Sequence, residues 1–407
     1  MLDTVSPGTE SPQFAQWAQS LKESAIQEML ALLARPGLLS FALGLPAAEL
    51  FPKEEFADAA IQVVSADPMA FQYQPTLRPL KTHIVDLMRQ RGVTCREEQI
   101  FITTGAQQAM NLLIHLLLDP GGQVLIEEII YSGFQQAIAP FQPEILTVPT
   151  DMETGIDVDA VEALLASGAR PAFIYAMSEG HNPLSISMSP EKRERLVALA
   201  RQYRVPILED DAYGFLAYDE HRSLPMRALD DQWVFYLGSF SKILMPALRV
   251  GWMVVPEELI EKVGIVKEAS DINTSTFTQR AIAAYLDAGH LPEHITQLRN
   301  EYRIRRDAMH DALLRHFPQE ARWKKPSNGM FFWVELPADV DMGEVLKTAV
   351  ESENVAFIPG HAFAVNGQHG SNCMRLNFSN ASPERIEDGI ARLGRVLQQS
   401  RGAKLDT

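Results

Sequence analysis

The chain alternates short apolar runs with longer segments whose apolar positions recur at helical spacing. Such alternation is typical of an α/β protein, in which each run forms a strand and each longer segment a covering helix. The predicted strands of one large sheet are residues 99–103, 123–126, 172–177, 205–208, 234–237 and 251–255. The predicted helices between them are residues 106–118, 132–137, 158–166 and 190–203. We expect functional side chains on the turns that follow the strands.

The pattern changes after a long helical stretch at residues 275–317. Strand-like and helical segments follow at residues 330–335, 342–352, 356–358, 374–378 and 383–400, and they predict a smaller α+β domain. At the other end of the chain, residues 24–34 have the pattern of an amphipathic helix and residues 38–51 that of extended chain. This N-terminal segment is too short to form a domain, so we expect it to pack on the rest of the chain or on a second subunit.

The 407 residues carry 36 Lys and Arg against 52 Asp and Glu, a net charge of -16, and 46% of them are apolar. These values fit a globular protein of two or three domains, and the acidic balance opposes binding to nucleic acid or anionic membranes. The two cysteines, Cys95 and Cys373, are in no metal-like spacing, so we predict neither a disulfide framework nor a metal site. Residues 1–13 lack the features of a signal peptide, so we expect a cytoplasmic protein.

The strongest chemical signal is the segment Gly-Ser-Phe-Ser-Lys at residues 238–242, directly after a predicted strand. A lysine amine attacks an aldehyde readily when burial or a neighbouring cation lowers its pKa. Ser239 and Ser241 leave room for a cofactor beside Lys242, and Arg249 follows seven residues later. An isolated Ser-x-Ser-Lys is more often a surface loop. Arg249 and the clusters that follow favour a functional lysine.

Three acidic residues, Glu209, Asp210 and Asp211, end the predicted strand at residues 205–208. A carboxylate at the C-terminal end of a strand can pair with a protonated pyridine nitrogen and keep the ring an electron sink. Tyr213 could hydrogen-bond the phenolic oxygen of such a ring. Taken alone, the cluster is explained about equally well by an acid that caps a helix.

Other candidate cofactor ligands also lie on turns. Gly105, Ala106 and Gln107 stand between a strand and a helix, where glycine and the free amides of the helix start favour a phosphate. Asn182 offers an amide to a phenolic oxygen, although Asn-Pro is also a common turn. Tyr131 could stack on a pyridine ring or serve as a core aromatic.

Arg375 lies in an otherwise apolar predicted strand. Burying an arginine is costly without an anionic partner, and its planar fork binds a carboxylate through two parallel hydrogen bonds. The α-carboxylate of an amino acid suits it, with an internal salt bridge as the alternative. His181, beside Asn182, is either a proton shuttle or, more commonly, a residue that orients a neighbour.

In order and spacing these clusters resemble the fold-type I pyridoxal-phosphate enzymes, the class I and II aminotransferases, over nearly the whole chain. The chain is most similar to the branch that contains 2-aminoadipate and kynurenine aminotransferases and the aminotransferase-like half of MocR regulators. The segments that fit this branch are Ser24-Ala25-Ile26 with Glu28, Ser40-Phe41-Ala42 with Gly44-Leu45-Pro46, Phe51-Pro52, Phe357-Ile358-Pro359-Gly360 and Arg375-Leu376-Asn377-Phe378-Ser379.

The resemblance implies a fold. A large domain at residues 51–285 would hold a mainly parallel seven-stranded sheet flanked by helices, and residues 286–407 would form the smaller α+β domain. Residues 1–50 would be an arm that packs on the small domain or on a dimer partner.

The resemblance also implies pyridoxal 5'-phosphate as cofactor, an amino acid and a 2-oxo acid as substrates, and a role for each matching residue. Lys242 would form the Schiff base and shuttle the proton, while Asp210 would bind the pyridine nitrogen. The other implied ligands are Tyr213 and Asn182 on the phenolic oxygen, Tyr131 on the ring, Gly105, Ala106, Gln107, Ser239, Ser241 and Arg249 on the phosphate, and Arg375, Asn182, Gly44 and Leu43 around the substrate. Tyr73 would reach the phosphate from the neighbouring subunit, which implies a homodimer with shared sites.

Several departures from the family pattern fall on the substrate side. The usual Asn-Pro-Thr-Gly reads Asn-Pro-Leu-Ser at residues 182–185, and leucines at 43 and 77 and Asn328 replace common glycines. Leu43 and Leu77 add bulk near the expected substrate channel, and Gln27 stands where the branch often has arginine. We therefore hypothesise a substrate outside the common acidic set, used in specialised biosynthesis.

The expected reaction is transamination, for which Lys242 needs a pKa of roughly 7–8, favoured by the cationic Schiff base and by Arg249. The same residues also support β-elimination, substitution, decarboxylation or oxidation of an amino acid, because the reaction depends on which Cα bond stands perpendicular to the ring. A non-catalytic MocR-like effector-binding protein is the alternative of another class. The acidic charge and the short segment before Ser24 argue against a DNA-binding domain.

Overall fold

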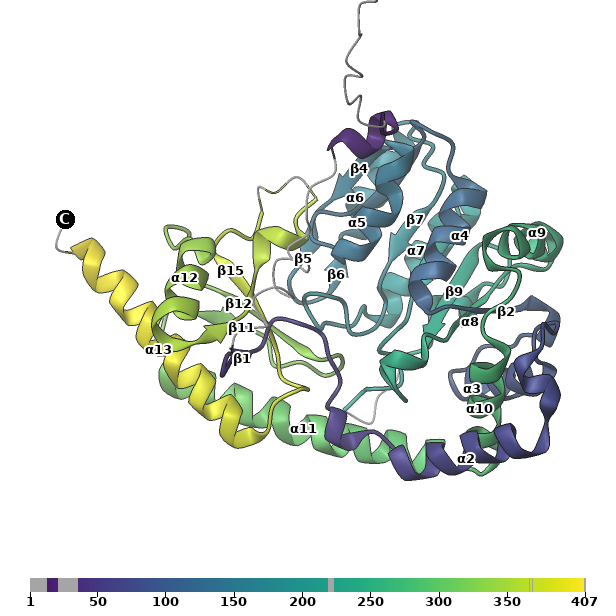
Figure 1. The fold of residues 1–407 in the computed structure, drawn as a ribbon. Helices are drawn as coiled ribbons and strands as arrows, with labels where there is room; N and C mark the ends of the chain where they lie inside the picture. Colours follow the sequence, from purple (N-terminus) through teal and green to yellow (C-terminus); the bar gives the residue numbers. More distant parts are fainter. Residues whose placement is uncertain (1–12, 21–35, 219–222, 366, 368, 406–407) are drawn as a thin grey trace, which may run out of the picture.

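The computed structural model describes residues 13–20, 36–218, 223–365, 367 and 369–405. A seven-stranded sheet crosses the larger part of the molecule (Figure 1). In spatial order its strands are β2 (Ile100–Thr103), β10 (Gly251–Val254), β9 (Val234–Ser239), β8 (Ile207–Asp210), β7 (Ile174–Ala176), β3 (Gln123–Glu127) and β4 (Glu144–Val148). Strand β10 runs antiparallel to β2 and β9, and the other neighbouring pairs are parallel. The predicted mainly parallel, seven-stranded α/β sheet is confirmed.

Helices cover both faces of this sheet because its central strands are apolar on both sides. On β7, Tyr175 belongs to one hydrophobic core, whereas Ile174 and Ala176 belong to another. The first core includes residues of α4 (Ala106–Leu117), α5 (Ser132–Ile138) and α9 (Ile260–Asp271), and the second includes residues of α6 (Val158–Ala166), α7 (Pro190–Tyr203) and α8 (Met226–Leu229).

A four-stranded antiparallel sheet lies on the other side of the molecule (Figure 1). Its strands are β11 (Arg322–Trp323), β12 (Phe331–Glu335), β15 (Cys373–Asn377) and β14 (Ile358–Pro359). The long helix α11 (Leu291–His316) runs beneath both sheets, with α13 (Pro383–Leu405) packed along it and α12 (Met342–Thr348) beside the small sheet. Strand β1 (Leu39–Ser40) joins this part of the molecule by pairing in parallel with β13 (Val355–Ala356).

Three further helices pack together at the far end of the large sheet, and a small hairpin lies between the two sheets. The helices are α2 (Lys53–Ala66), α3 (Arg78–Gln90) and α10 (Thr276–Asp287), and the hairpin is β5 (Thr150–Asp151) with β6 (Gly155–Ile156).

Some predicted elements differ from the observed ones. The helical stretch at residues 275–317 is two helices, α10 and α11, separated where Gly289 has a φ of 79°. The strand expected at residues 356–358 is divided between β13 and β14, which pair with different strands. The helix expected at residues 342–352 ends as α12 and continues in a π-helical turn, Ala349–Glu353. The helix expected at residues 24–34 lies outside the described residues.

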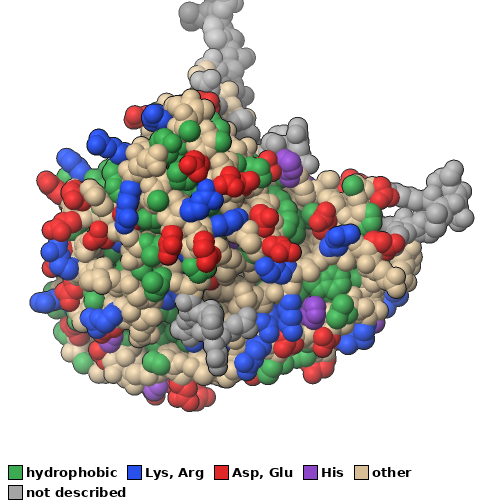
Figure 2. Space-filling view, turned by 180° about the vertical axis from the view of Figure 1, so that it is seen from behind, with side chains coloured by type: hydrophobic (Ala, Val, Ile, Leu, Met, Phe, Trp, Pro, Cys, Tyr) green, Lys and Arg blue, Asp and Glu red, His purple; other side chains and the backbone are tan. Residues whose placement is uncertain are grey.

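The outer surface carries both signs of charge. Acidic and basic side chains are interspersed over the face in Figure 2, with small apolar areas between them. Within the described ranges, every helix is too short or too polar to span a membrane.

Candidate functional site

A pocket of about 310 Å³ lies where the two sheets meet. Asp210 and Ser239, the last residues of β8 and β9, reach it from the large sheet, at the strand edge where open α/β sheets bind ligands. Phe331 of β12 and Arg375 of β15 reach it from the small sheet. The full lining is Leu43, Gly44, Leu45, Ala106, Gln107, Met110, Tyr131, Met177, Asn182, Asp210, Ala212, Tyr213, Ser239, Ser241, Lys242, Arg249, Phe331 and Arg375.

Lys242 lies in the turn after β9 and reaches into this pocket. Its Nζ donates a hydrogen bond to the Gly44 carbonyl at 2.8 Å. Burial, assisted by the positive charges of Arg375 and Arg249, lowers the pKa of Lys242 from 10.5 to about 8. The lysine is therefore a far better nucleophile at neutral pH than a surface lysine. Arg249 contributes as predicted, but desolvation is the larger cause.

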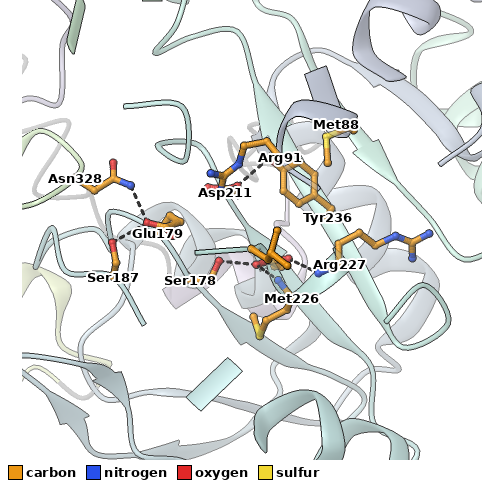
Figure 3. A network of polar contacts seen from close by, with 12 residues as sticks. Met88, Arg91, Ser178, Glu179, Ser187, Asp211, Met226, Arg227, Tyr236 and Asn328 are labelled. Carbon is orange, nitrogen blue, oxygen red and sulfur yellow. Dashed lines mark hydrogen bonds and ion pairs between the residues drawn. The ribbon is translucent and has the colours of Figure 1, made fainter. Parts of the chain in front are cut away.

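The three acids at the C-terminal end of β8, Glu209 and Asp210 within the strand and Asp211 just after it, have three different surroundings. Glu209 accepts hydrogen bonds from the amides of Met226 and Arg227, at 2.8 and 2.9 Å, at the start of α8. Asp211 binds Arg91 at 2.8 Å and Tyr236 at 2.9 Å (Figure 3). The helix-capping explanation therefore applies to Glu209, while Asp210 lines the pocket.

Asp210 is buried, and one of its oxygens is bound from behind. The Tyr175 hydroxyl donates to Oδ2 at 2.7 Å, whereas Oδ1 has no hydrogen-bond partner among the residues that the structure describes. Burial raises the pKa of Asp210 from 3.8 to about 6, and the neighbouring charge of Asp211 acts in the same direction. A cationic donor placed at Oδ1 would reverse this shift.

An anion-binding corner lies at the start of α4. Gly105 precedes the helix with a φ of 77°, and a Cβ atom there would stand 2.7 Å from Nη2 of Arg249. Arg249 thus passes directly over the helix start, whose amides and dipole favour an anion. The Ser239 hydroxyl accepts the Ser241 amide at 3.1 Å, and Gln107 donates to the Gly133 carbonyl at 2.9 Å.

Arg375 has hydrogen-bond partners, but it has no counter-ion among the residues that the structure describes. It donates to Oδ1 of Asn182 at 2.7 Å and to the Ala42 carbonyl at 2.6 Å. Its guanidinium lies over the rings of Phe331 and Phe363, at 4.2 and 4.6 Å from their centroids. Among the described residues no carboxylate approaches within ion-pair distance, and burial lowers the pKa of Arg375 to about 10. The internal salt bridge considered from the sequence is therefore absent from this part of the chain.

Most of the predicted site residues meet in this pocket, but Gly105, Tyr73, Leu77 and His181 do not line it. Gly105 lies just outside, against Arg249. Tyr73 is 81% exposed and belongs to a separate surface hollow with Phe71. Leu77, expected beside the substrate channel, instead precedes α3 and packs on the core.

Sequence reasoning missed five lining residues and one supporting residue. The lining residues are Leu45, Met110, Met177, Ala212 and Phe331, and the supporting residue is Tyr175, which binds Asp210. Leu45 and Phe331 lie within segments that did match the family or a predicted strand. Their apolar side chains carry no motif of their own.

His181 and Glu179 lie behind the pocket wall and do not line it. Nε2 of His181 stands 3.2 Å from Oε2 of Glu127, and both side chains are buried. Glu179 accepts hydrogen bonds from Ser187 and Asn328 (Figure 3). It also accepts one from Arg193. These positions favour an orienting role for His181 over a proton shuttle.

The chain matches a known protein family and known relatives over most of its length. The family model "Aminotransferase class I and II" matches residues 41–393. The 2-aminoadipate transaminase of Thermus thermophilus is 39% identical over 97% of this chain and 98% of its own length. The aromatic-amino-acid aminotransferase 1 of Thermococcus litoralis is 35% identical over 95% of this chain and 94% of its own.

One solved structure shares the fold of this protein over nearly the whole chain. The α-aminoadipate aminotransferase LysN of Thermus thermophilus, complexed with N-(5'-phosphopyridoxyl)-L-leucine, matches with a TM-score of 0.89 and 37% identity, over 96% of this chain and 98% of that chain. The fold is thus that of the fold-type I α/β enzymes. The chain belongs to the class I and II aminotransferases and is a pyridoxal-phosphate-dependent enzyme that exchanges amino groups between amino acids and 2-oxo acids.

The residues of the pocket fit this cofactor. The unpartnered Oδ1 of Asp210 suits a protonated ring nitrogen, and the corner formed by Arg249 and the start of α4 suits a phosphate. The amine of Lys242 faces the same space with a lowered pKa. The pocket therefore offers a carboxylate to the ring nitrogen, a cation to the phosphate and a nucleophilic amine to the aldehyde of the cofactor.

Proposed function

We propose that this aminotransferase acts on amino acids with uncharged, mainly apolar side chains. The observation that carries the proposal is the character of the substrate-side wall, which is formed by Leu43, Leu45 and Phe331. The cations that line the pocket in the described ranges are already engaged, with Lys242 as nucleophile, Arg249 at the anion corner and Arg375 for an α-carboxylate. An acidic side chain would be buried against leucine and phenylalanine without a partner, which costs about 1–3 kcal/mol or more.

Relatives support this choice in part. One is named for aromatic amino acids, and the solved relative was complexed with a leucine adduct of the cofactor. The Thermus thermophilus matches, in sequence and in structure, are nevertheless named for 2-aminoadipate. The chain thus falls among enzymes that handle apolar and acidic side chains, and its own wall favours the apolar ones.

We propose the following roles in the reaction. When bound, pyridoxal phosphate supplies an aldehyde that joins the Lys242 amine and a ring that withdraws electrons from the substrate's Cα. Lys242 takes the Cα proton and delivers it one atom away, for which its pKa of about 8 is suited. Asp210 remains ionised against the ring nitrogen, and Tyr175 keeps its carboxylate in place.

The remaining residues bind and orient. Tyr213 and Asn182 donate hydrogen bonds to the phenolic oxygen, and Tyr131 covers the ring. Gly105, Ala106, Gln107, Ser239, Ser241 and Arg249 hold the phosphate. Arg375 pairs with the α-carboxylate of the substrate, beside Gly44 and Leu43. Support for the last pairing is a buried guanidinium whose Nε has no partner among the described residues.

A substrate panel tests the proposal. Single-turnover rates of the cofactor-loaded enzyme would be measured with leucine, methionine, phenylalanine, glutamate and 2-aminoadipate, together with formation of the 2-oxo acid. We expect the best apolar amino acid to exceed the acidic ones in kcat/KM by at least about tenfold, because an unpaired buried carboxylate costs about 1–3 kcal/mol. If glutamate or 2-aminoadipate has the highest kcat/KM of the panel, the proposal is wrong.

We also propose a homodimer in which Tyr73 completes the pocket of the partner subunit. Support comes from an exposed apolar surface around it: Phe71 is 66% exposed and stacks on Phe277 at 5.7 Å, and Ile272 is 65% exposed. Surfaces of this kind mark protein interfaces. Residues 1–50 would form the arm, 51–285 the large domain and 286–407 the small domain, and the enzyme would work in the cytoplasm.

Hybrid dimers test the shared site. Chains with Lys242→Ala and chains with Tyr73→Ala would be unfolded and refolded together. If Tyr73 serves the partner, one site of each hybrid carries both changes and the other carries neither, so activity returns toward half of a wild-type dimer. Activity no higher than the mean of the two parents means that Tyr73 acts within its own chain.

A further inference from the structure

Two loops meet behind the substrate side of the pocket. The asparagine loop, residues 178–188, carries Asn182 and is closed by a hydrogen bond from the Met188 amide to the Ser178 carbonyl at 2.9 Å. The strand-entry loop, residues 327–331, leads into β12 and ends at Phe331. The loops touch backbone to backbone, since a Cβ at Gly180 would stand 3.1 Å from Cα of Gly329.

Ser185 has a backbone conformation that residues with a side chain rarely adopt. Its φ is 50°, in the left-handed region where glycine is the ordinary choice. Its hydroxyl, however, accepts the amide of Phe331 at 2.9 Å, and both groups are buried. The hydroxyl therefore satisfies the first amide of β12, and a glycine could not do so.

A second contact joins the same two loops. The side-chain amide of Asn328 donates to Oε2 of Glu179 at 2.8 Å, and its side-chain oxygen Oδ1 accepts the Gly329 amide at 2.6 Å. Glu179 is held in turn by Ser187 at 2.7 Å (Figure 3). Arg193 holds it as well, at 2.6 Å. Asn328 is thus anchored to a buried carboxylate that cannot move without breaking an ion pair.

These contacts converge on the ring of Phe331. That ring lies 4.2 Å from the guanidinium carbon of Arg375 and packs edge-on against Tyr213, with 6.1 Å between the ring centroids. A Cβ at Gly44 would stand 2.8 Å from Cζ of Phe331, so the ring leaves no free space on that side. A small shift of the strand-entry loop would therefore move the wall beside Arg375 and Gly44.

We infer that Ser185 and Asn328 are positioning residues that fix the Phe331 ring, and that through this ring they set how Arg375 holds the substrate carboxylate. Neither side chain lines the pocket. The inference rests on the proposed role of Arg375, but it does not depend on which side chain the substrate carries. Their effect should therefore appear in substrate binding before it appears in the chemical step.

Ser185→Gly is the decisive variant, because glycine fits the left-handed backbone and only the hydroxyl is lost. We expect KM for the best amino acid of the panel to rise about 5- to 20-fold and kcat to change less. Relief of the unfavourable φ should offset part of the cost of the lost hydrogen bond, so the thermal midpoint should fall less than in Ser185→Ala. The dissociation constant of 4-methylpentanoate, an unreactive carboxylate followed by the visible spectrum of the loaded enzyme, should rise by the same factor as KM.

Three other variants separate positioning from stability. Ser185→Ala should raise KM equally but lower the thermal midpoint, because alanine keeps the unfavourable φ. Ser189→Gly, at the start of α7 where Ser189 accepts the Lys192 amide, should lower the midpoint and leave KM unchanged. Asn328→Ala should raise KM in the same direction as Ser185→Gly.

A double variant tests the route through the ring. If Ser185 acts through Phe331, then Ser185→Gly should no longer raise KM in a Phe331→Leu background. The inference is overturned if Ser185→Gly leaves both KM and the dissociation constant within twofold of wild type, or if its effect persists undiminished with Phe331→Leu. Because the best amino acid is used whatever its class, a wrong substrate proposal would show in the panel and not here.

Discussion

The cofactor side and the substrate side of the pocket are built in different ways. The cofactor side comes from the C-terminal ends of strands of one sheet, with Asp210 as the last residue of β8, Ser239 as the last residue of β9, and Lys242 in the turn after β9. Its groups are polar, and contacts within the large sheet or its turns hold several of them, such as the hydrogen bond from Tyr175 to Asp210 and that from the Ser241 amide to Ser239. Folding of the large sheet therefore fixes most of the geometry of the cofactor side.

The substrate side is assembled from segments that are distant in the sequence. Leu43 precedes the large sheet, whereas Phe331 and Arg375 come from the small one. Its shape depends on contacts between loops, such as those of Ser185 and Glu179. Changes on the cofactor side should therefore abolish the reaction, while changes on the substrate side should retune it.

Lys242→Ala should have the largest effect. It removes the amine that we propose moves the Cα proton, and general acid–base catalysis alone is worth about 10²–10⁴-fold. We expect single-turnover transamination to fall by at least this factor and the visible band of the lysine-linked cofactor to disappear. Lys262→Ala, on the exposed face of α9, is the matched control and should change neither. A persistent band in Lys242→Ala would place the attachment elsewhere.

The same contrast explains what could be predicted from the sequence. The strands ending at Asp210 and Ser239 are buried on both faces, so their apolar runs stand out against the flanking turns. Strand β4 was missed because three of its five residues are exposed and its pattern is mixed. The edge position, with a neighbour on one side only, removes the burial that makes a strand readable.

The substrate side was harder to predict for the same physical reason. Phe331 and Leu45 are apolar residues whose importance comes only from where the chain places them. Asn328 stands out in the sequence as a departure from a glycine pattern. Its hydrogen bond to Glu179 could not be predicted, because it depends on how the fold brings the two loops together. Residue type predicts chemistry, whereas packing between distant segments decides shape.

Asp210→Asn should lower transamination by about 10²–10³-fold, because a neutral amide no longer stabilises a protonated ring nitrogen, a charge-pair effect worth several kcal/mol. Asp210→Asn should also change how the stability of the cofactor-free protein depends on pH. Burial raises the pKa of Asp210 from 3.8 to about 6 in the cofactor-free protein. A raised carboxyl pKa stabilises the fold below the unfolded-state value, and this stability is lost as the pH rises through the folded-state value.

The cofactor-free wild type should therefore lose on the order of 1–3 kcal/mol between about pH 4 and pH 6, and Asp210→Asn should not. Thermal unfolding of the cofactor-free proteins at pH 4.5 and 7.5 measures the difference. Asp231→Asn, an exposed acid, is the control. Equal destabilisation by Asp210→Asn at both pH values would show that Asp210 is ionised without penalty in the empty pocket.

Arg375→Lys should affect binding more than chemistry. Lysine keeps a charge but cannot place two parallel donors on a carboxylate while also reaching Asn182. We expect KM for the amino acid to rise about 10- to 100-fold, the equivalent of one or two lost charge-assisted hydrogen bonds. The cofactor spectrum should remain that of wild type. A loss of cofactor without a change in KM would assign Arg375 to the cofactor side instead.

Leu43→Ala should have the smallest effect and is the sharpest test of where the substrate side lies. Removing part of an apolar wall costs about 1–1.5 kcal/mol for a side chain that contacts it, so KM for leucine should rise about 5- to 10-fold while KM for glutamate stays level. The matched control is Leu77→Ala, the other leucine in place of a family glycine, which packs on the core beside α3. That change should lower the thermal midpoint and leave the ratio of the two KM values unchanged. If Leu77→Ala shifts the ratio and Leu43→Ala does not, the channel is built by the partner subunit, and the wall formed by Leu43, Leu45 and Phe331 does not select the substrate.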